Sequence, residues 1–284
     1  ATLLLVVVLL LAPPLGRGAK RVAVVGGGAA GVFAAITCAR TAGGGKLIVE
    51  VFEATATPLD KVARSGGGRC NVMHDPAVGA EEIVKRGYPR GHRELRSVIG
   101  SVFTPDMTHQ WFEAAGVPLK VEQDGRVFPV SDSSGDVVDA LLRAAKEAGV
   151  KIHSQSKILS VAAAHGGDAG GDGGDGGNGY EVRVGRKGGE ELFHADAVIV
   201  ASGSAACGRK WSERLGHDIV PPVPSLFGFK LAGGSVLDGL PGLSLPDVAL
   251  TLVDKVPGPA EEPEEGKKKK KKGKGKPGPA ARAA

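Results

Sequence analysis

The sequence predicts an α/β fold built around a parallel β-sheet, and three features predict it. Residues 20–53 run through a strand, a glycine-rich turn, a helix and a second strand, as a βαβ unit does. Residues 197–201 (AVIVA) are wholly apolar, which is typical of a parallel strand buried on both faces. An amphipathic helix pattern at 133–148 leads directly into a further strand pattern at 150–153. At 284 residues and 42% hydrophobic side chains, the chain can bury such a core.

The βαβ unit begins with the β-branched strand Lys20–Val25, continues with the alanine-rich helix Ala29–Ala42, and ends with the strand Leu47–Glu53. Helices are expected next at Arg93–Phe103 and Pro105–Ala115. Thr104 is the predicted cap of the second, with proline in its first turn.

A β-hairpin is predicted to follow, with strands Val117–Glu122 and Arg126–Val130 joined by the turn pair Asp124-Gly125. The amphipathic helix then starts after Ser133 or Ser134 and runs to Ala148, where Gly149 ends it. Three strands complete the pattern before residue 197, at 150–153, 158–163 and 180–186.

Composition divides the chain into four parts. Residues 1–18 form an apolar leader, which we interpret either as the remnant of a targeting signal or as an exposed or misassigned start. Residues 19–220 form the α/β domain, in which 166–179 (GGDAGGDGGDGGNG) is a flexible insertion at a hairpin tip. Residues 221–254 begin a second, β-rich domain with short strands at 226–231 and 248–253, and we expect it to be incomplete. Residues 255–284 are a lysine-rich tail that cannot bury a core.

The charge distribution argues against nucleic-acid binding by the folded body. Residues 255–284 carry 10 of the 36 Lys and Arg residues but only 4 of the 31 Asp and Glu residues. The net charge of +5 therefore comes from the tail, and residues 1–254 are nearly neutral. The apolar run at 2–12 is too short to span a bilayer comfortably.

Three cysteines, Cys38, Cys70 and Cys207, lie far apart, without a CxxC pair or a histidine at ligand spacing. This spacing argues against a disulfide framework and against a metal site, and it favours a reducing compartment. That compartment is the cytoplasm, or a plastid if the leader is a targeting remnant. The sequence does not define the oligomeric state.

A nucleotide-binding fingerprint follows the first strand. Gly26, Gly28 and Gly31 have the G-x-G-x-x-G spacing and open a helix, which is the context that this motif requires. We predict that Gly26, Gly28, Ala29, Ala30 and Gly31 bind the pyrophosphate of a dinucleotide at the helix N-terminus. Glu53 ends the second strand and is predicted to bind a ribose diol, which favours FAD or NAD over a phosphorylated ribose.

A second glycine-rich segment contains Ser65, Gly66, Gly67, Gly68, Arg69, Cys70 and Asn71. Its glycines can expose backbone N–H groups, and Arg69 adds a cation, so the loop suits an anion or a flavin edge. An ordinary surface loop is the alternative. Together with the fingerprint, this loop favours FAD over NAD, although a conventional NAD-dependent dehydrogenase stays open.

Five segments in this order resemble one family: RVAVVGGGAAGVFAA, LDKVARSGGGRCNVMHD, DGRVFPVSD, AVIVASGS and LGHDIVPPVPSLFGFKL. They resemble the BaiN-like or aminoacetone-oxidase-like FAD-dependent oxidoreductases, over residues 20–254. PLDKV and YPRGHRELR resemble a cyanobacterial and plant-type branch. The resemblance implies a Rossmann-like FAD-binding domain of the two-dinucleotide-binding-domain flavoprotein type, with the start of an inserted β-rich second domain.

The resemblance also implies roles for individual residues. Lys61 and the 65–71 loop line the flavin side, and a strand residue near Val161 contacts adenine through its backbone. Ser202-Gly203 matches the Thr-Gly of a short Ala-Thr-Gly-Gly motif that ends a strand near FAD. Here Ser202 replaces the threonine and Ser204 the second glycine.

Function follows from the cofactor rather than from a side chain. No obvious acid, base or nucleophile is present, so the catalytic residues are unassigned and the hydride chemistry belongs to the flavin. Cys70 lacks a partner for a redox disulfide and is interpreted as a packing residue. We expect an FAD-dependent oxidoreductase acting on a small molecule, with NAD(P)H as a candidate electron donor. The alternatives are an inactive fragment that stops before the family's C-terminal FAD segment, and a non-catalytic nucleotide-binding protein.

Overall fold

The computed structural model describes residues 8–11, 19–41, 47–88, 90–164 and 179–223, together with residues 234, 239 and 249. The chain divides into two compact units, Ala1–Leu226 and Phe227–Ala284, and every helix and strand given below lies in the first. Several predicted features lie outside the described residues: the insertion at 166–178, the strand at 226–231, nearly all of the strand at 248–253, and the tail at 255–284.

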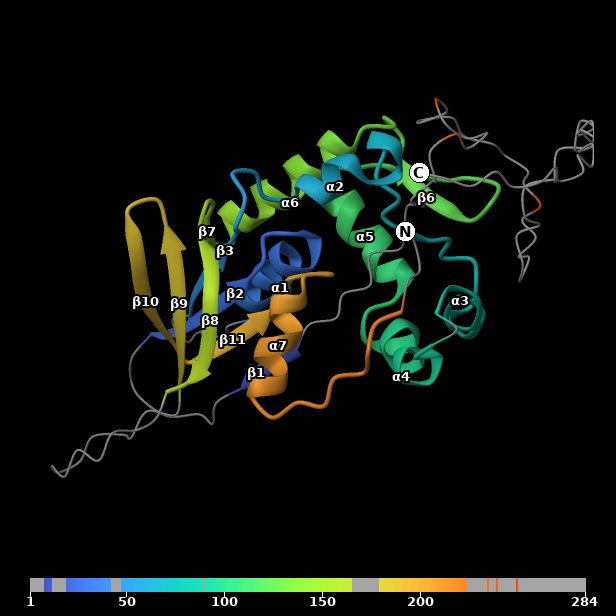
Figure 1. The fold of residues 1–284 in the computed structure, drawn as a ribbon. Coiled ribbons are helices and arrows are strands. Elements are labelled where there is room, and N and C mark those ends of the chain that lie inside the picture. The colour runs from blue at the N-terminus through green and yellow to red at the C-terminus, as the bar shows by residue number, and fades with distance from the viewer. Residues whose placement is uncertain are drawn as a thin grey trace, which may run out of the picture. The chain divides into compact units, whose positions relative to one another are not determined.

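A five-stranded sheet with the order β1-β11-β2-β3-β7 forms the centre of the first unit (Figure 1). Strands β11, β2, β3 and β7 pair in parallel, whereas β1 pairs antiparallel with β11. Val24 of β2 lies opposite Val51 of β3 and Ile199 of β11. The predicted parallel sheet is therefore confirmed. Its strands are β1 (Val8–Leu11), β2 (Lys20–Val25), β3 (Leu47–Phe52), β7 (Lys151–His153) and β11 (Ala197–Val200).

One face of this sheet is covered by helices. Val22, Val24, Val49 and Val51 alternate along β2 and β3 and pack into a single core with the apolar sides of these helices. Ser133 caps α6, since its hydroxyl accepts a hydrogen bond from the Gly135 amide at 3.2 Å. The helices are α1 (Ala29–Arg40), α2 (Asp60–Arg64), α5 (Pro105–Ala114) and α6 (Ser134–Glu147).

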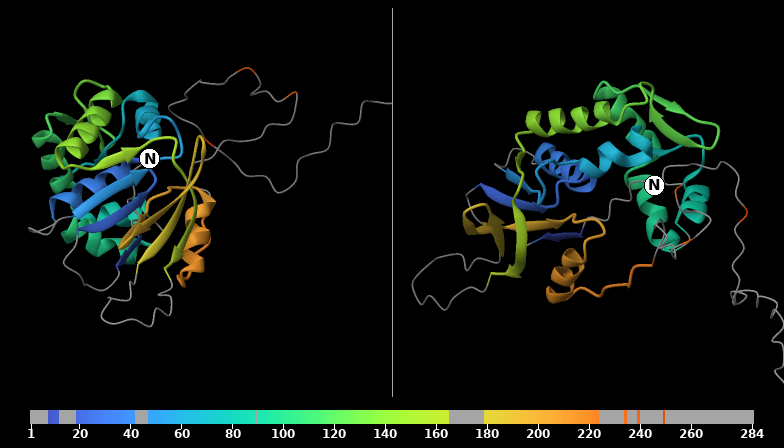
Figure 2. Two further views of the ribbon diagram at one scale, coloured as in Figure 1. Left: turned by 90° about the vertical axis from the view of Figure 1, so that its left-hand side faces the viewer. Right: turned by 45° about the horizontal axis from the view of Figure 1, so that its top comes forward.

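The opposite face is covered by an antiparallel sheet with the order β10-β9-β8 (Figure 2). Ala23, Val25 and Phe52 point to this side, where they pack against residues such as Val182 and Phe193. Both faces of the parallel strands are thus buried, which explains their continuous apolar sequence. The covering elements are β8 (Lys157–Ala163), β9 (Tyr180–Arg186), β10 (Gly189–Ala195) and α7 (Ala206–Arg214), and Trp211 of α7 belongs to the same core.

A second small sheet, β4-β6-β5, is antiparallel and carries the predicted hairpin. Its strands are β4 (Met73–His74), β5 (Leu119–Val121) and β6 (Arg126–Pro129). Between β4 and α5 lie α3 (Ala80–Gly87), α4 (His92–Ser97) and the π-helical turn Val98–Val102 (η2). A single 3-10 turn, Ser65–Gly68 (η1), precedes β4.

The observed elements match most predicted positions. The helix expected over 93–103 is present, because α4 continues without a break into the π-helical turn Val98–Val102; only the hydrogen-bonding pattern changes after Ser97. Gly100 and the β-branched residues around it, where this pattern changes, have low helix propensity. The sequence pattern did not predict six of the observed elements: β1, which lies in the segment interpreted as a leader, and α2, β4, α3, β10 and α7.

Candidate functional site

The glycine fingerprint is a tight turn between β2 and α1. Gly26 has a φ of +109°, and its amide donates to the Phe52 carbonyl at 2.9 Å. A methyl group added at Gly26 would lie 2.5 Å from the carbonyl oxygen of Ala201, and one added at Gly31 would overlap the carbonyl oxygen of Gly26. Both positions therefore require glycine to bring β2, β11 and α1 this close together.

Gly28 differs from its neighbours because it faces open space. It is the N-cap of α1 with extended backbone, and a methyl group added there would meet no atom within 4 Å. Glycine has no side chain with which to cap the amides of Ala29, Ala30 and Gly31. A helix N-terminus of this kind can bind an anionic group through those amides. The turn thus fits the pyrophosphate of a dinucleotide.

Glu53 lies directly against this turn. Its Oε2 accepts a hydrogen bond from the Gly27 amide at 2.7 Å, and its Oε1 accepts from the amide and the hydroxyl of Thr55 at 2.8 Å each. The Glu53 amide donates to the His153 carbonyl at 2.9 Å, which links the end of β3 to β7. The carboxylate is therefore fixed beside the glycines, where Oε2 accepts only one of these hydrogen bonds and keeps capacity for a further one.

Residues from three distant segments meet at the carboxyl ends of β2, β3 and β11. Leu59 donates from its amide to the Gly27 carbonyl at 2.8 Å, and Ala201 donates to Val25 at 2.9 Å. A methyl group added at Gly203 would lie 3.9 Å from Lys61 Nζ. The structure therefore brings Lys61 and Ser202-Gly203 together. The carboxyl edge of parallel strands is where open α/β sheets bind their ligands.

Helix α2 leads from Leu59 into the second glycine segment. Gly66, Gly67 and Gly68 all have positive φ, at 57°, 71° and 88°. Methyl groups added at Gly67 and Gly68 would meet no atom within 4 Å, so this part of the loop also faces open space. Ser65 is held by its hydroxyl, which donates to the Val62 carbonyl at 2.8 Å.

Cys70 and Asn71 close the loop. Cys70 is buried with a φ of 60°, and its amide donates to the Ser65 carbonyl at 3.0 Å. Burial raises the pKa of the Cys70 thiol, although a hydrogen bond with Ser65 opposes that effect. A thiol with a raised pKa is a poor nucleophile, which fits a packing role. Asn71 Oδ1 accepts from the Val127 amide of β6 at 3.2 Å.

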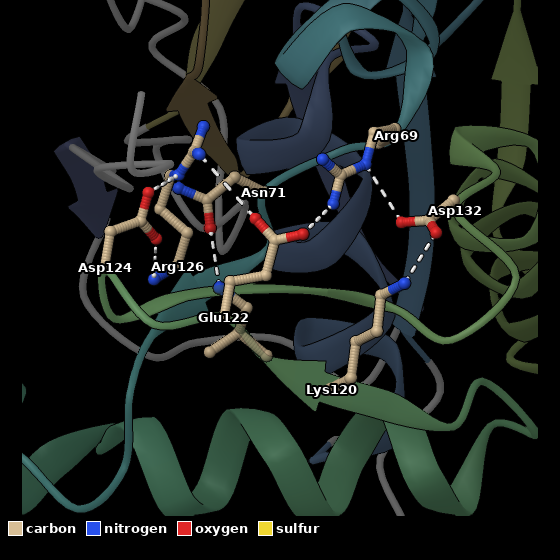
Figure 3. Close-up of polar contacts among 8 residues, drawn as sticks. Arg69, Asn71, Lys120, Glu122, Asp124, Arg126 and Asp132 are labelled. Atoms are coloured by element: carbon tan, nitrogen blue, oxygen red, sulfur yellow. Dashed lines mark hydrogen bonds and ion pairs between the residues drawn. The ribbon is translucent and has the colours of Figure 1, made fainter. Parts of the chain in front are cut away.

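Arg69 and Val161 lie in surroundings that the sequence does not reveal. The Arg69 guanidinium pairs with Glu122 and Asp132 from the hairpin region (Figure 3). It also lies over the ring of Phe128 in β6. Val161 lies in β8 with only 3% of its surface exposed, in the same core as Val25 and Phe52. The segment DGRVFPVSD contains Phe128 and Asp132, but only the three-dimensional structure shows that they contact Arg69.

A separate polar cluster lies within the core on the side of β8–β10. Glu50 of β3 is only 7% exposed. Its carboxylate interacts with Arg21 of β2 at 3.2 Å and with His153 of β7 at 3.1 Å. Burial alone would raise the pKa of Glu50, but the hydrogen bonds and charges of His153 and Arg21 outweigh it and lower the pKa. This cluster ties three parallel strands together.

Within the described part of the chain, no group of three or more His, Cys, Asp or Glu side chains is arranged to hold a metal ion. A search of the same residues finds no helix with the length and apolar character needed to cross a membrane.

Comparison with known proteins identifies the family. Residues 20–236 match the family described as the HI0933-like protein Rossmann domain. The chain belongs to the HI0933-like family. This membership confirms the Rossmann-type FAD-binding α/β fold and, at the level of the family, the expected resemblance; the cyanobacterial and plant-type branch stays a prediction.

Similar proteins include the 3-dehydro-bile acid delta(4,6)-reductase of Clostridium scindens, which is 25% identical over 219 residues. That alignment covers 74% of this chain and 47% of the relative, so the chain spans about half the length of the curated protein.

Among solved structures, Thermovibrio ammonificans THI4 is similar with a TM-score of 0.45 and 15% identity, over 69% of this chain and 62% of THI4. Adenylylsulfate reductase of Archaeoglobus fulgidus is similar with a TM-score of 0.42 and 21% identity, over 66% of this chain and 31% of that one.

Proposed function

We propose that this chain binds FAD and supplies the cofactor domain of a flavin-dependent oxidoreductase that acts on a small molecule. One observation carries the proposal: the fingerprint turn is bonded to Glu53 and to Leu59, from which α2 leads into the 65–71 loop, and Gly28, Gly67 and Gly68 each face open space. A methyl group at any of these three glycines would occupy that space. The residues present therefore fit an extended dinucleotide with a flavin at its far end.

In this proposal each part of the site has its own task. The amides of Gly28, Ala29, Ala30 and Gly31 bind the pyrophosphate, and the Glu53 carboxylate accepts hydrogen bonds from the adenosine ribose while it keeps its bond to Gly27. The backbone of the 65–71 loop, Lys61 and Ser202-Gly203 line the flavin side, and the backbone near Val161 contacts adenine. Bound flavin supplies the hydride transfer.

The direction and partners of the reaction are also proposals. The curated relative in Clostridium scindens is named a reductase. We propose that the whole protein likewise reduces or oxidises a small organic substrate, with NAD(P)H as electron donor. The three cysteines Cys38, Cys70 and Cys207 are free thiols in the structure. Their wide spacing in the sequence, without a CxxC pair, is the reason for the proposal that the protein works in a reducing compartment.

The test compares two glycines in matched positions. Gly28 caps α1 and Gly79 caps α3; both have extended backbone, and a methyl group at either would meet no atom within 4 Å. We expect the 284-residue chain to retain FAD, seen as a protein-bound absorbance band near roughly 450 nm. Gly28→Leu should lose that band because the side chain fills the space needed by the pyrophosphate.

Gly79→Leu should keep both the band and the melting temperature. Failure of the unaltered chain to bind added FAD would overturn the proposal, and so would equal FAD binding by the two leucine variants. The expected stability of Gly28→Leu is close to that of Gly79→Leu, because neither leucine replaces a packing contact.

A further inference from the structure

The 65–71 loop needs an external restraint to hold one shape. Three consecutive glycines, Gly66 to Gly68, adopt left-handed conformations, and Cys70 does so as well. Glycines lose more conformational freedom on ordering than other residues, so this run favours many shapes over one. Two of the glycines face open space, where packing gives no help. The restraint therefore has to come from the other residues of the loop.

Arg69 supplies contacts of the required kind. Its Nε donates to Asp132 Oδ1 at 2.9 Å, another guanidinium nitrogen pairs with Glu122, and the guanidinium carbon lies 3.9 Å from the centre of the Phe128 ring. A planar guanidinium can satisfy two carboxylates and stack on an aromatic ring at once, whereas a lysine cannot. All three partners come from the β5–β6 hairpin or from the turn after it; Figure 3 shows the two carboxylates.

The hairpin carboxylates are themselves fixed. Asp132 has a φ of 56° and also accepts from Lys120 Nζ at 2.5 Å, and Glu122 lies 3.6 Å from Arg126. Hydrogen bonds from Lys120 and Arg69 lower the pKa of Asp132, and hydrogen bonds to Glu122 and Asp132 raise that of Arg69. Asp132 and Arg69 therefore stay ionised near neutral pH.

The loop is anchored to β6 at its C-terminal end. After the glycines, Asn71 accepts from the Val127 amide at 3.2 Å, and the Val72 amide donates to the Val127 carbonyl at 2.9 Å. At the first glycine, a methyl group added to Gly66 would lie 3.1 Å from the Phe128 ring, so the loop also passes close to β6 there. Arg69 lies between these two places and closes the gap from the loop to the hairpin.

We propose that Arg69 is a positioning residue: it clamps the 65–71 loop onto Glu122, Asp132 and Phe128, and the loop backbone, rather than the guanidinium, meets the flavin. This inference rests on the proposed function. Under this proposal Glu122 and Asp132 help to shape the flavin site by holding Arg69, although neither belongs to a glycine motif. An anionic ligand could take over the guanidinium only by displacing two carboxylates that are already paired with it.

The test is a double-mutant cycle in the 284-residue chain. One arm is Arg69→Gln, the other is the pair Glu122→Gln and Asp132→Asn, and the third combines all three changes. Asparagine suits position 132 because it tolerates a left-handed backbone. FAD affinity and the visible circular dichroism of bound flavin are measured beside the melting temperature.

If the clamp positions the loop, each arm weakens FAD binding about tenfold and alters the flavin dichroism in the same way. The variant that combines all three changes should then bind FAD about as weakly as either arm alone. Arg183→Gln is the control: it removes an exposed cation that pairs with Glu190 in the β9–β10 hairpin and touches none of the residues of the clamp, and FAD affinity should change less than twofold. Unchanged affinity and dichroism in the carboxylate arm, with both lost in Arg69→Gln, would overturn the clamp in favour of direct contact.

A second readout does not need flavin. The Cys70 and Val72 amides donate within the loop and to β6. Without FAD, their hydrogen exchange should speed up about tenfold in both arms relative to the unaltered chain and to Arg183→Gln. Faster exchange in a chain that binds no FAD would sink the proposed function and leave the clamp standing. Unchanged exchange in both arms would sink the clamp alone.

Discussion

The two glycine-rich segments of the site are held in place by different physical means. The turn at 26–31 is fixed by backbone packing, since Gly26 touches Ala201 and Gly31 touches Gly26 so closely that no side chain fits. The loop at 65–71 has open space around Gly67 and Gly68 and depends on the ionic and aromatic contacts of Arg69. The first segment should therefore be intolerant of added atoms, and the second should be sensitive to charge.

The largest expected effect is at the backbone-packed turn. Gly31→Ala should lower the free energy of unfolding by about 3 kcal/mol, because the added methyl group overlaps the carbonyl of Gly26 and forces α1 away from β2. Alanine has a higher helix propensity than glycine. At a helix position with free space around it, the same substitution would therefore raise the free energy of unfolding. Urea unfolding measures the change.

Gly79→Ala is the control for this substitution, because it adds the same methyl group to a helix N-cap that has no close neighbour. Its unfolding free energy should change by less than about 1 kcal/mol. Equal effects at the two glycines would show that backbone packing does not fix the turn.

A second prediction concerns the ionic cluster of Glu50 with the partly exposed Arg21 and His153. Glu50→Gln should lower the free energy of unfolding by about 2 kcal/mol at pH 7, because it removes the charge that accepts hydrogen bonds from Arg21 and His153. The pKa of Glu50 is lowered in the folded state from its ordinary 4.5. Its contribution is therefore fully present above about pH 4.5 and is lost as the pH falls through the folded pKa.

Unfolding measured between pH 7 and pH 3 tests the sign of this effect. The unaltered chain should lose stability over this range more steeply than Glu50→Gln, and the two curves should converge at the acid end. Parallel curves would mean that the carboxylate is not stabilised by folding. Glu190→Gln, in an exposed pair with Arg183, is the matched control and should change little.

A smaller effect is expected in the second glycine segment. Gly67 has a φ of 71° and no neighbour at its Cβ position, so Gly67→Ala adds backbone strain without a collision. Gly67→Ala should lower the free energy of unfolding by about 1 kcal/mol, and Gly67→Asn should lower it less because asparagine tolerates the left-handed region better. Thermal unfolding shows which of the two variants is the more stable. A larger loss with asparagine would mean that the space over the loop is closed in solution.

The same contrast explains what the sequence could and could not predict. The turn at 26–31 was predictable because its glycines are local in sequence and their spacing reflects backbone contacts between adjacent elements. The parallel sheet was predictable because its strands are buried on both faces. The place of Arg69 was not, since its partners Glu122 and Asp132 lie 53 and 63 residues away and look like ordinary hairpin charges. Nor does any local pattern show that Glu50, inside an apolar strand, meets Arg21 and His153.

The smallest expected effect is a difference between the two glycine segments in how their amide hydrogen exchange responds to salt. At 1 M NaCl the screening length falls to roughly 3 Å, so the half-exposed pairs of Arg69 with Glu122 and Asp132 weaken, whereas contacts between backbone atoms do not. Hydrogen exchange of the Cys70 amide should rise by about threefold between 0.1 M and 1 M NaCl, and that of Gly26, which donates to Phe52, should stay constant. Arg69→Gln should abolish the salt response of Cys70, because the ionic restraint is already absent. A salt response that persists in this variant would place the restraint on the loop elsewhere than in the Arg69 ion pairs.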